Sequence, residues 1–168
     1  MPEILIGVGS NIGDRTEWIK GSLHRIRDDG KIQLWRNSHL RLYPPLGGMK
    51  QREFLNGVFV GYTPLMPLSL LEYLKKVERQ FCRRPTYKWG PRTLDLDILF
   101  YGKSVLTLPR LCVPHRSFLK REFALELAAE VCPRLKHPVV GRTCQELWRE
   151  FAEKKHHNSP PASPGWPR

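Results

Sequence analysis

Two aspartates separated by one residue, Asp95 and Asp97, are the strongest chemical signal in the sequence. Residues 93–101 alternate in a way typical of a β-strand, and residues i and i+2 of a strand project to the same face. Two carboxylates held side by side repel each other unless a cation lies between them. Mg²⁺ is typically bound by one or two carboxylates together with substrate phosphates. The pair therefore indicates a Mg²⁺ site for a polyphosphate, with two solvated acids on an exposed strand as the alternative.

The aspartates lie in a strongly basic segment. From Arg83 to Arg121 there are nine Lys or Arg residues and only two acids, Asp95 and Asp97. Phosphoryl transfer depends mainly on positioning and on neutralisation of charge by Mg²⁺, Arg and Lys. The basic candidates for phosphate binding are Arg83, Arg84, Lys88, Arg92, Arg110, His115, Lys120 and Arg121. The alternative is a solubility surface or a nucleic-acid patch, and we expect some of these residues, such as Lys120, to be only that.

Three aromatic residues, Phe54, Trp89 and Phe123, occur near polar or loop-rich segments. Flat rings can sandwich a planar heterocycle, although core packing is the ordinary use of each ring alone. Asn56 shares a strand face with Phe54, and its amide offers both a donor and an acceptor to the edge of a heterocycle. A backbone-satisfying core amide is the alternative for Asn56.

The elements that position these residues follow from periodicity and from turn residues. Leu94, Leu96, Ile98 and Phe100 alternate with Thr93, Asp95, Asp97 and Leu99, so we expect the first set to face away from the aspartates. We expect strands at 3–8, 32–42, 54–62 and 93–101, and helices at 16–28, 67–81, 118–130 and 143–155. Strands and helices do not alternate steadily, which favours an α+β sandwich with helices packed over a largely antiparallel sheet.

The turn after the first strand carries the glycine-rich run Gly7-Val8-Gly9-Ser10-Asn11-Ile12-Gly13. Ile12 stands where a dinucleotide-binding fingerprint has its third glycine, and the sequence contains no Walker A motif. The run therefore predicts a tight chain reversal, followed by a helix whose N-cap is Asp14 or Thr16.

Length and composition fit one domain over residues 1–155, followed by a disordered Pro-rich tail at 156–168. The formal net charge of +12 indicates anionic partners. No apolar run approaches the ~20 residues of a membrane helix, and the N-terminus has no signal-peptide pattern, so we expect a cytoplasmic protein. The four cysteines are irregularly spaced, which favours free thiols over a zinc site.

Taken in order, these pieces resemble the 6-hydroxymethyl-7,8-dihydropterin pyrophosphokinase family of folate biosynthesis. The resemblance covers about residues 3 to 140, and its most specific part is the W-G-P-R-T-x-D-x-D stretch that ends at Asp97. The matching segments are Gly9-Ser10-Asn11-Ile12-Gly13-Asp14-Arg15, Pro44-Pro45-Leu46-Gly47, Phe54-Leu55-Asn56, Glu78, Lys88 to Leu99, Val113-Pro114-His115 and Arg121-Glu122-Phe123.

The resemblance implies a ferredoxin-like core and an enzyme that transfers pyrophosphate from ATP to the pterin alcohol. It implies two Mg²⁺ ions on Asp95 and Asp97. The implied ATP-binding residues are Glu78, Trp89, Arg92, Ile98, Arg110, His115 and Arg121, and the implied pterin-binding residues are Leu46, Phe54, Asn56, Trp89, Asp95 and Phe123. Arg83, Arg84 and Arg92 join the two aspartates as catalytic residues, and we expect residues 82–91 to close over ATP.

Two other functions are weighed against this one. A nucleic-acid-binding module would explain the charge, but no standard nucleic-acid motif occurs and an acid pair repels phosphate without a metal. A pterin or nucleotide sensor would not need both aspartates. We therefore expect a monomer whose partners are ATP and the reduced pterin, with no nucleic acid and no membrane.

Overall fold

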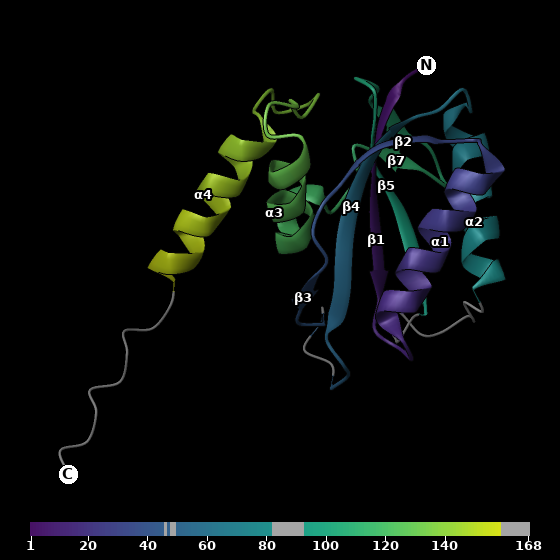
Figure 1. Ribbon diagram of the computed structural model, residues 1–168. Helices are drawn as coiled ribbons and strands as arrows, with labels where there is room; N and C mark the ends of the chain where they lie inside the picture. Colours follow the sequence, from purple (N-terminus) through teal and green to yellow (C-terminus); the bar gives the residue numbers. More distant parts are fainter. Residues whose placement is uncertain (46, 48–49, 82–92, 159–168) are drawn as a thin grey trace, which may run out of the picture.

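An antiparallel sheet forms the centre of the chain in the computed structural model, which describes residues 1–45, 47, 50–81 and 93–158 (Figure 1). Its strands lie in the order β2-β4-β1-β5, and the short strand β3 pairs with β4 beyond the end of β2. The bounds are Glu3–Ser10 for β1, Gln33–Asn37 for β2, Arg41–Tyr43 for β3, Phe54–Tyr62 for β4 and Asp95–Tyr101 for β5. The prediction for β4 is confirmed at both ends, whereas β1 runs two residues beyond the predicted end at Val8.

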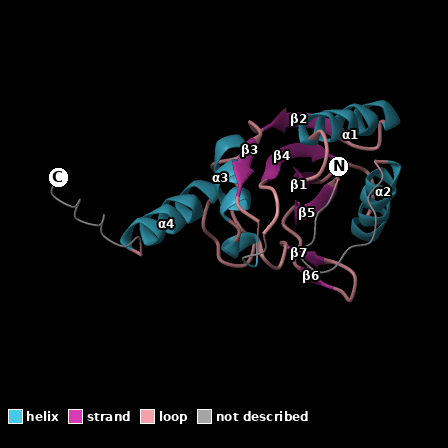
Figure 2. Ribbon diagram, turned by 90° about the horizontal axis from the view of Figure 1, so that it is seen from below, coloured by secondary structure: helices cyan, strands magenta, loops and turns pink. Residues whose placement is uncertain are grey.

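Helices cover both faces of this sheet, as Figure 2 shows from below. Helices α1 (Arg15–Asp29) and α2 (Pro67–Gln80) pack on one face, α3 (Glu122–Val131) packs on the other, and α4 (Cys144–His157) packs against α3. A small hairpin, β6 (Leu106–Thr107) and β7 (Cys112–Val113), precedes the 3₁₀ turn η2 (Phe118–Lys120). The β1-α1-β2 and β4-α2-β5 units with this strand order confirm the predicted α+β, ferredoxin-like class.

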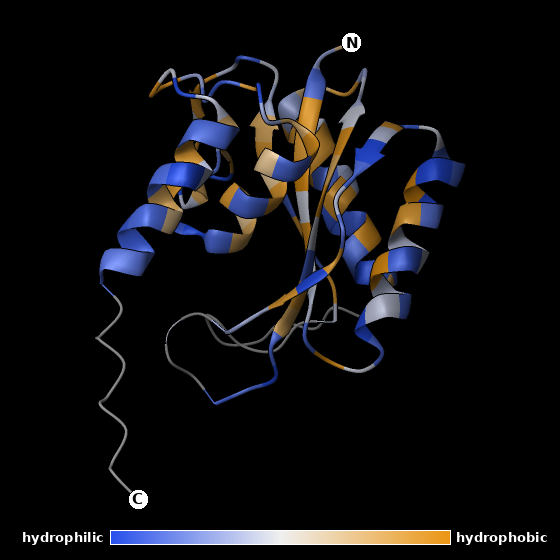
Figure 3. Ribbon diagram, turned by 60° about the vertical axis from the view of Figure 1, so that its left-hand side comes forward, coloured by the Kyte–Doolittle hydropathy of each residue, from blue (hydrophilic) through white to orange (hydrophobic). Residues whose placement is uncertain are grey.

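Each face of the sheet has its own apolar core. Ile6, Leu74 and Leu96 belong to the core under α1 and α2, whereas Leu5 and Leu125 belong to the core under α3. In Figure 3 the strands are largely apolar, and α4 at the outside of the second face is largely hydrophilic. Period-two strands with both faces covered produce this pattern, because alternate side chains must fill both cores.

Strand β5 contains a bulge that the sequence pattern did not predict. Ile98 pairs with Ile6 and Phe100 pairs with Leu5, so Leu99 is an extra residue on this strand. Leu96 and Ile98 face the first core as predicted, but Phe100 packs in the second core together with Leu99. The prediction that Phe100 shares the face of Leu96 is therefore wrong, because one inserted residue shifts the alternation.

The strand predicted at 32–42 is broken into β2 and β3. Ser38 bonds β4 at the break: its N–H donates to Val58 O at 2.8 Å, and its Oγ accepts from Val58 N at 2.9 Å. The side chain of Leu40 fills the space above Gly57, where a Cβ would lie 2.7 Å from Leu40 Cδ2. A glycine in the neighbouring strand thus allows the chain to turn inward at this point.

The remaining boundaries differ from the predictions at their ends. Asp14 caps α1, and its carboxylate accepts from Glu17 N at 3.2 Å. The helix predicted at 118–130 divides into η2 and α3, because Arg121 between them is extended. Helix α4 continues through His157, so the predicted boundary between the domain and the tail, at residue 156, is too early. Residues 159–168, the rest of the predicted tail, lie outside the described part of the chain.

Candidate active site

A cavity of about 530 Å³ opens beside the first half of β5. Strands β1, β3, β4 and β5, helices α2, α3 and α4, and the segment from 110 to 121 line it. Ten of the predicted site residues meet there: Phe54, Asn56, Glu78, Asp95, Asp97, Ile98, Arg110, His115, Arg121 and Phe123. The other five, Leu46, Arg83, Arg84, Trp89 and Arg92, lie outside the described residues.

Asp95 and Asp97 project from β5 opposite two glycines. Asp95 pairs with Gly9 and Asp97 pairs with Gly7 on the central strand β1. Directly paired residues of antiparallel strands project to the same face, so the carboxylates have no side chain beside them on β1. The ring of Phe123 and the amide of Asn56 occupy the space over these glycines, so the acid pair lies next to the aromatic end of the cavity.

Glu78 holds the backbone between the two aspartates. It is almost fully buried on α2, and its Oε1 accepts from the backbone N–H of Leu96 at 2.8 Å. Because β5 is an edge strand, this N–H has no neighbouring strand to bond on that side. Glu78 therefore fixes the acid pair to helix α2 in addition to lining the cavity.

Arg121 connects the acid pair with the aromatic end of the cavity. Its Nη1 lies 3.2 Å from Asp97 Oδ2, and its guanidinium lies 5.9 Å from the centre of the Phe123 ring. Arg121 Nε is buried and has no hydrogen-bond partner among the described residues. A buried guanidinium N–H of this kind is suited to a ligand oxygen, such as one on a phosphate.

His115 is held in its neutral form beside these charges. Burial, together with the positive charge of Arg121, lowers the pKa of His115 to about 4, against the opposite effect of Asp95. Its Nδ1 accepts from the backbone N–H of Ser117 at 3.1 Å, which places the proton of the neutral ring on Nε2. His115 thus offers a neutral hydrogen-bond donor in a wall that is otherwise cationic.

The aromatic end combines rings with one amide. The Phe123 ring packs over Gly7, and the amide of Asn56 lies over Gly9, where a Cβ would meet Asn56 Nδ2 at 3.1 Å. Asn56 Oδ1 is buried and makes no hydrogen bond within the described part of the chain. An unpaired buried acceptor in a cavity that Phe54 and Phe123 also line is suited to the N–H groups of a planar heterocycle.

The acid pair fits Mg²⁺ bound to a nucleotide better than a cation held by protein alone. No group of three or more potential His, Cys, Asp or Glu ligands exists among the described residues. Mg²⁺ commonly takes one or two carboxylates and completes its shell with phosphates and water. Two carboxylates and the basic residues that line the same cavity meet that requirement.

Sequence comparison identifies the family of the chain. A family model for 7,8-dihydro-6-hydroxymethylpterin-pyrophosphokinase matches residues 5–133. The chain belongs to this family. A 2-amino-4-hydroxy-6-hydroxymethyldihydropteridine pyrophosphokinase of Pseudomonas aeruginosa is 40% identical over 144 residues, 86% of this chain and 88% of that protein. The Aquifex aeolicus protein of the same name is 34% identical over 147 residues, 88% of this chain and 91% of that one.

Structure comparison supports the fold. The Plasmodium falciparum HPPK-DHPS structure with pteroate superposes with a TM-score of 0.73 and 13% identity, over 94% of this chain. The chain spans 43% of the length of that protein, so this likeness concerns the fold alone. Membership of the pyrophosphokinase family carries the activity: pyrophosphate transfer from ATP to 6-hydroxymethyl-7,8-dihydropterin in folate biosynthesis.

Several cavity residues were not predicted. Lys75 could have been found, because it shares a side of α2 with Glu78, one turn away. Tyr43 pairs with Phe54 across β3 and β4, so the register would have placed it. Lys120, expected to be a solubility residue, also lines the cavity. Phe151 reaches it from α4 through packing that the pyrophosphokinase motifs do not signal.

No helix within the described ranges is long and apolar enough to span a membrane.

Proposed function

We propose that this cavity carries out the pyrophosphokinase reaction, with ATP at its basic end and the pterin at its aromatic end. The observation that supports this most is the meeting of the acid pair, the cationic wall and the Asn56 and Phe123 end in one cavity. A phosphate chain needs the first two, and a neutral heterocycle needs the third. The two substrates then meet beside Asp95 and Asp97.

The acid pair is the proposed Mg²⁺ site. Asp95 and Asp97 would hold two Mg²⁺ ions together with ATP, and these ions would supply neutralisation of the phosphate charge. Asp95 and Asp97 would supply the carboxylate ligands from one face of β5. Glu78 keeps the spacing of the aspartates constant through its bond to Leu96 N.

The basic wall is the proposed ATP site. Arg121 and Arg110 neutralise phosphate charge, and His115 donates through Nε2 without adding charge. Ile98 and Glu78 border the nucleotide from the β5 and α2 sides. Trp89, Arg92, Arg83 and Arg84, which lie outside the described residues, are proposed to complete this site from the family resemblance.

The aromatic end is the proposed pterin site. Phe123 and Phe54 hold the ring, and Asn56 reads its edge through the buried Oδ1. Asp95, Leu46 and Trp89 complete the site as the resemblance implies. In the reaction, the pterin hydroxyl oxygen bonds to the β-phosphorus of ATP and loses its proton. The bond from the β-phosphorus to the bridging oxygen of the α-phosphate breaks, and AMP leaves.

The test is the identity of the nucleotide product. The protein is incubated with ATP, Mg²⁺ and 6-hydroxymethyl-7,8-dihydropterin, and the nucleotides are separated and quantified. We expect one AMP for each pterin consumed, and loss of the reaction when EDTA removes the metal. A matched incubation without pterin controls for hydrolysis. Formation of ADP, or of AMP at the same rate without pterin, would contradict the proposal.

A further inference from the structure

A buried tyrosine forms part of the aromatic wall of the cavity. Tyr43 is the last residue of β3, pairs with Phe54 of β4 and lines the cavity. Only 8% of it is exposed. Its ring centre lies 6.0 Å from that of Phe123, with the ring planes tilted by 58°. This separation lies in the range of a direct aromatic contact, so the position of one ring affects the other.

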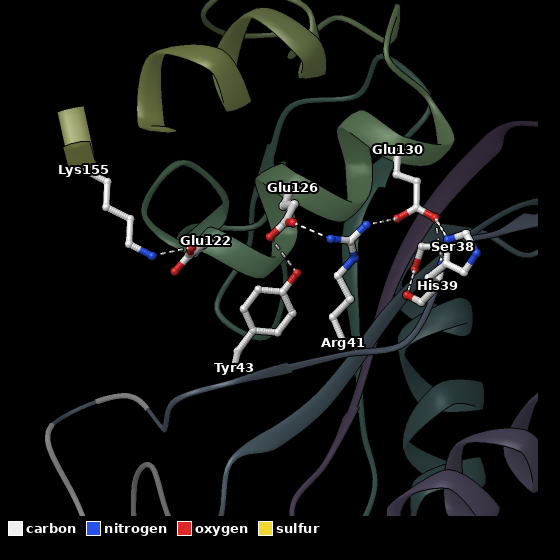
Figure 4. Close-up of polar contacts among 8 residues, drawn as sticks. All are labelled: Ser38, His39, Arg41, Tyr43, Glu122, Glu126, Glu130 and Lys155. Atoms are coloured by element: carbon white, nitrogen blue, oxygen red, sulfur yellow. Dashed lines mark hydrogen bonds and ion pairs between the residues drawn. The ribbon is translucent and has the colours of Figure 1, made fainter. Parts of the chain in front are cut away.

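The hydroxyl of Tyr43 is anchored to helix α3. It donates to Glu126 Oε2 at 3.0 Å, while Arg41 Nη1 donates to Glu126 Oε1 at 2.9 Å (Figure 4). Burial and the bond to Glu126 raise the pKa of Tyr43, so the phenol keeps its proton and remains a donor. One carboxylate thus holds two residues of β3 against the helix that carries Phe123.

Glu126 belongs to a row of three glutamates on α3, and it shares Arg41 with Glu130, whose Oε2 lies 3.7 Å from Arg41 Nη2. Glu122 pairs with Lys155 of α4 at 2.6 Å, and Glu130 pairs with His39 Nδ1 at 2.6 Å. Figure 4 shows the three carboxylates one helical turn apart along α3. Among these three, Glu126 is the one whose hydrogen-bond partner is an aromatic residue of the cavity wall.

We propose that Tyr43 is a pterin-site residue and that Glu126 positions it, setting the distance between the Tyr43 and Phe123 rings and thereby the affinity for the pterin. The proposal rests on the proposed function, because it assumes that the pterin occupies the aromatic end. Phe123 and Glu126 are three residues apart on α3 and so share a side of the helix. The Tyr43–Glu126 bond therefore ties β3 to α3 at the level of the ring that would contact the pterin.

Removing the Tyr43–Glu126 hydrogen bond should raise the KM for the pterin and leave the KM for ATP nearly unchanged. In Tyr43→Phe the ring stays but loses its hydrogen bond to α3, and in Glu126→Leu helix α3 loses the bonds of Glu126 to Tyr43 and Arg41. We expect each change to raise the KM for the pterin about 10-fold, as loss of one hydrogen bond to a charged group does, with the KM for ATP within about 2-fold of the wild type. Glu126→Gln keeps an acceptor for the hydroxyl, so its KM for the pterin should stay within about 3-fold of the wild type.

The experiment measures both KM values by AMP formation, with the other substrate saturating. Glu130→Leu is the matched control, because it removes an ion-paired glutamate one turn further along α3 and away from the cavity. The double variant Tyr43→Phe/Glu126→Leu should be no worse than Glu126→Leu alone, because Glu126→Leu already removes the Tyr43–Glu126 bond.

Three results would overturn the positioning role. The first is a KM for the pterin in Tyr43→Phe and Glu126→Leu that equals the KM in Glu130→Leu. The second is an equal rise of the KM for the pterin and the KM for ATP in Tyr43→Phe and Glu126→Leu. The third is a KM for the pterin in the double variant that rises by the product of the two single effects. Absence of pterin-dependent AMP in the wild-type protein is a different result. It would contradict the proposed function and, with it, the pterin role of Tyr43.

Discussion

At the scale of single residues, the cavity divides between charged and neutral recognition. Arg121, Asp97 and Asp95 provide opposite charges within one wall, and Arg121 touches the neutral end through Phe123. His115 lines the same cavity and is an uncharged donor. ATP is charged and the pterin ring is neutral, so a substitution at the charged end should weaken binding of ATP, and one at the aromatic end should weaken binding of the pterin.

Phe123 is the residue for which stacking and core packing predict different results. It is half-buried and packs over Gly7, which leaves part of the ring facing the cavity. We expect Phe123→Ala to weaken pterin binding by about 1–3 kcal/mol, as loss of an aromatic platform does. Binding of ATP should change little. Calorimetric titration of each substrate and a melting curve check this.

A role of Phe123 in core packing would give a different result. Loss of a fully buried core ring would cost about 3–5 kcal/mol of stability. A strongly lowered Tm with equal weakening of both substrates would show that Phe123 is a core residue.

His115 should make stability depend on pH. Because burial lowers its pKa from 6.5 to about 4, the unfolded chain takes up the proton first as pH falls. The contribution is therefore fully present above pH 6.5 and is lost as pH falls towards 4. Relative to His115→Gln, the wild-type protein should lose about 2 kcal/mol of unfolding free energy between pH 7 and pH 5. Urea unfolding of both proteins at the two pH values measures this, and an equal loss in both would contradict the buried neutral form.

At the scale of elements, the sequence predicts those whose composition or periodicity is strong. Strand β4 has the expected bounds because its composition is rich in β-forming residues. Helix α2 ends within one residue of the predicted end because its apolar residues repeat with one clear period. The acid pair was placed on one strand face for the same reason. The resemblance to a family then supplied the roles of Glu78 and Asn56, which their residue types alone left open.

The parts that were missed depend on neighbouring strands and helices. The bulge at Leu99 arises from pairing with Leu5 and Ile6, and the break at Ser38 needs the glycine at 57 opposite. Local periodicity does not contain either partner. Phe151 likewise reaches the cavity only because α4 packs on α3.

The hydrogen bonds that cap the N-terminus of α4 should contribute to the stability of the protein. Thr143 and Glu146 form a capping box: Thr143 Oγ1 accepts from Glu146 N at 3.2 Å, and Glu146 Oε2 accepts from Thr143 N at 2.9 Å. We expect Thr143→Ala to lower the unfolding free energy by about 1 kcal/mol, whereas Thr143→Ser keeps the cap and should lose much less. Thermal unfolding of the two variants measures the difference. Equal stability of the two variants would show that the cap does not hold this helix.

At the scale of the whole molecule, the formal net charge of +12 should favour one substrate. ATP is strongly anionic and the pterin is neutral, so only ATP gains from the field of the protein. Raising KCl from about 0.05 M to about 0.5 M should raise the KM for ATP several-fold, because salt screens exposed charges, and should leave the KM for the pterin nearly unchanged. The assay is run at constant free Mg²⁺. Parallel changes in both constants would contradict separate charged and neutral ends.

The central claim is that Asp95 and Asp97 act together on the phosphates of ATP while the pterin lies beside them. The most direct measurement is the rate of Mg²⁺-dependent, pterin-dependent AMP formation by the wild type, Asp95→Asn and Asp97→Asn. Asp28→Asn, which changes an exposed acid on α1, is the matched control. We predict a loss of turnover of about 100-fold or more in each of the first two variants, with the fold intact and the control unaffected. Near-normal turnover in either variant at ordinary Mg²⁺ would contradict the account.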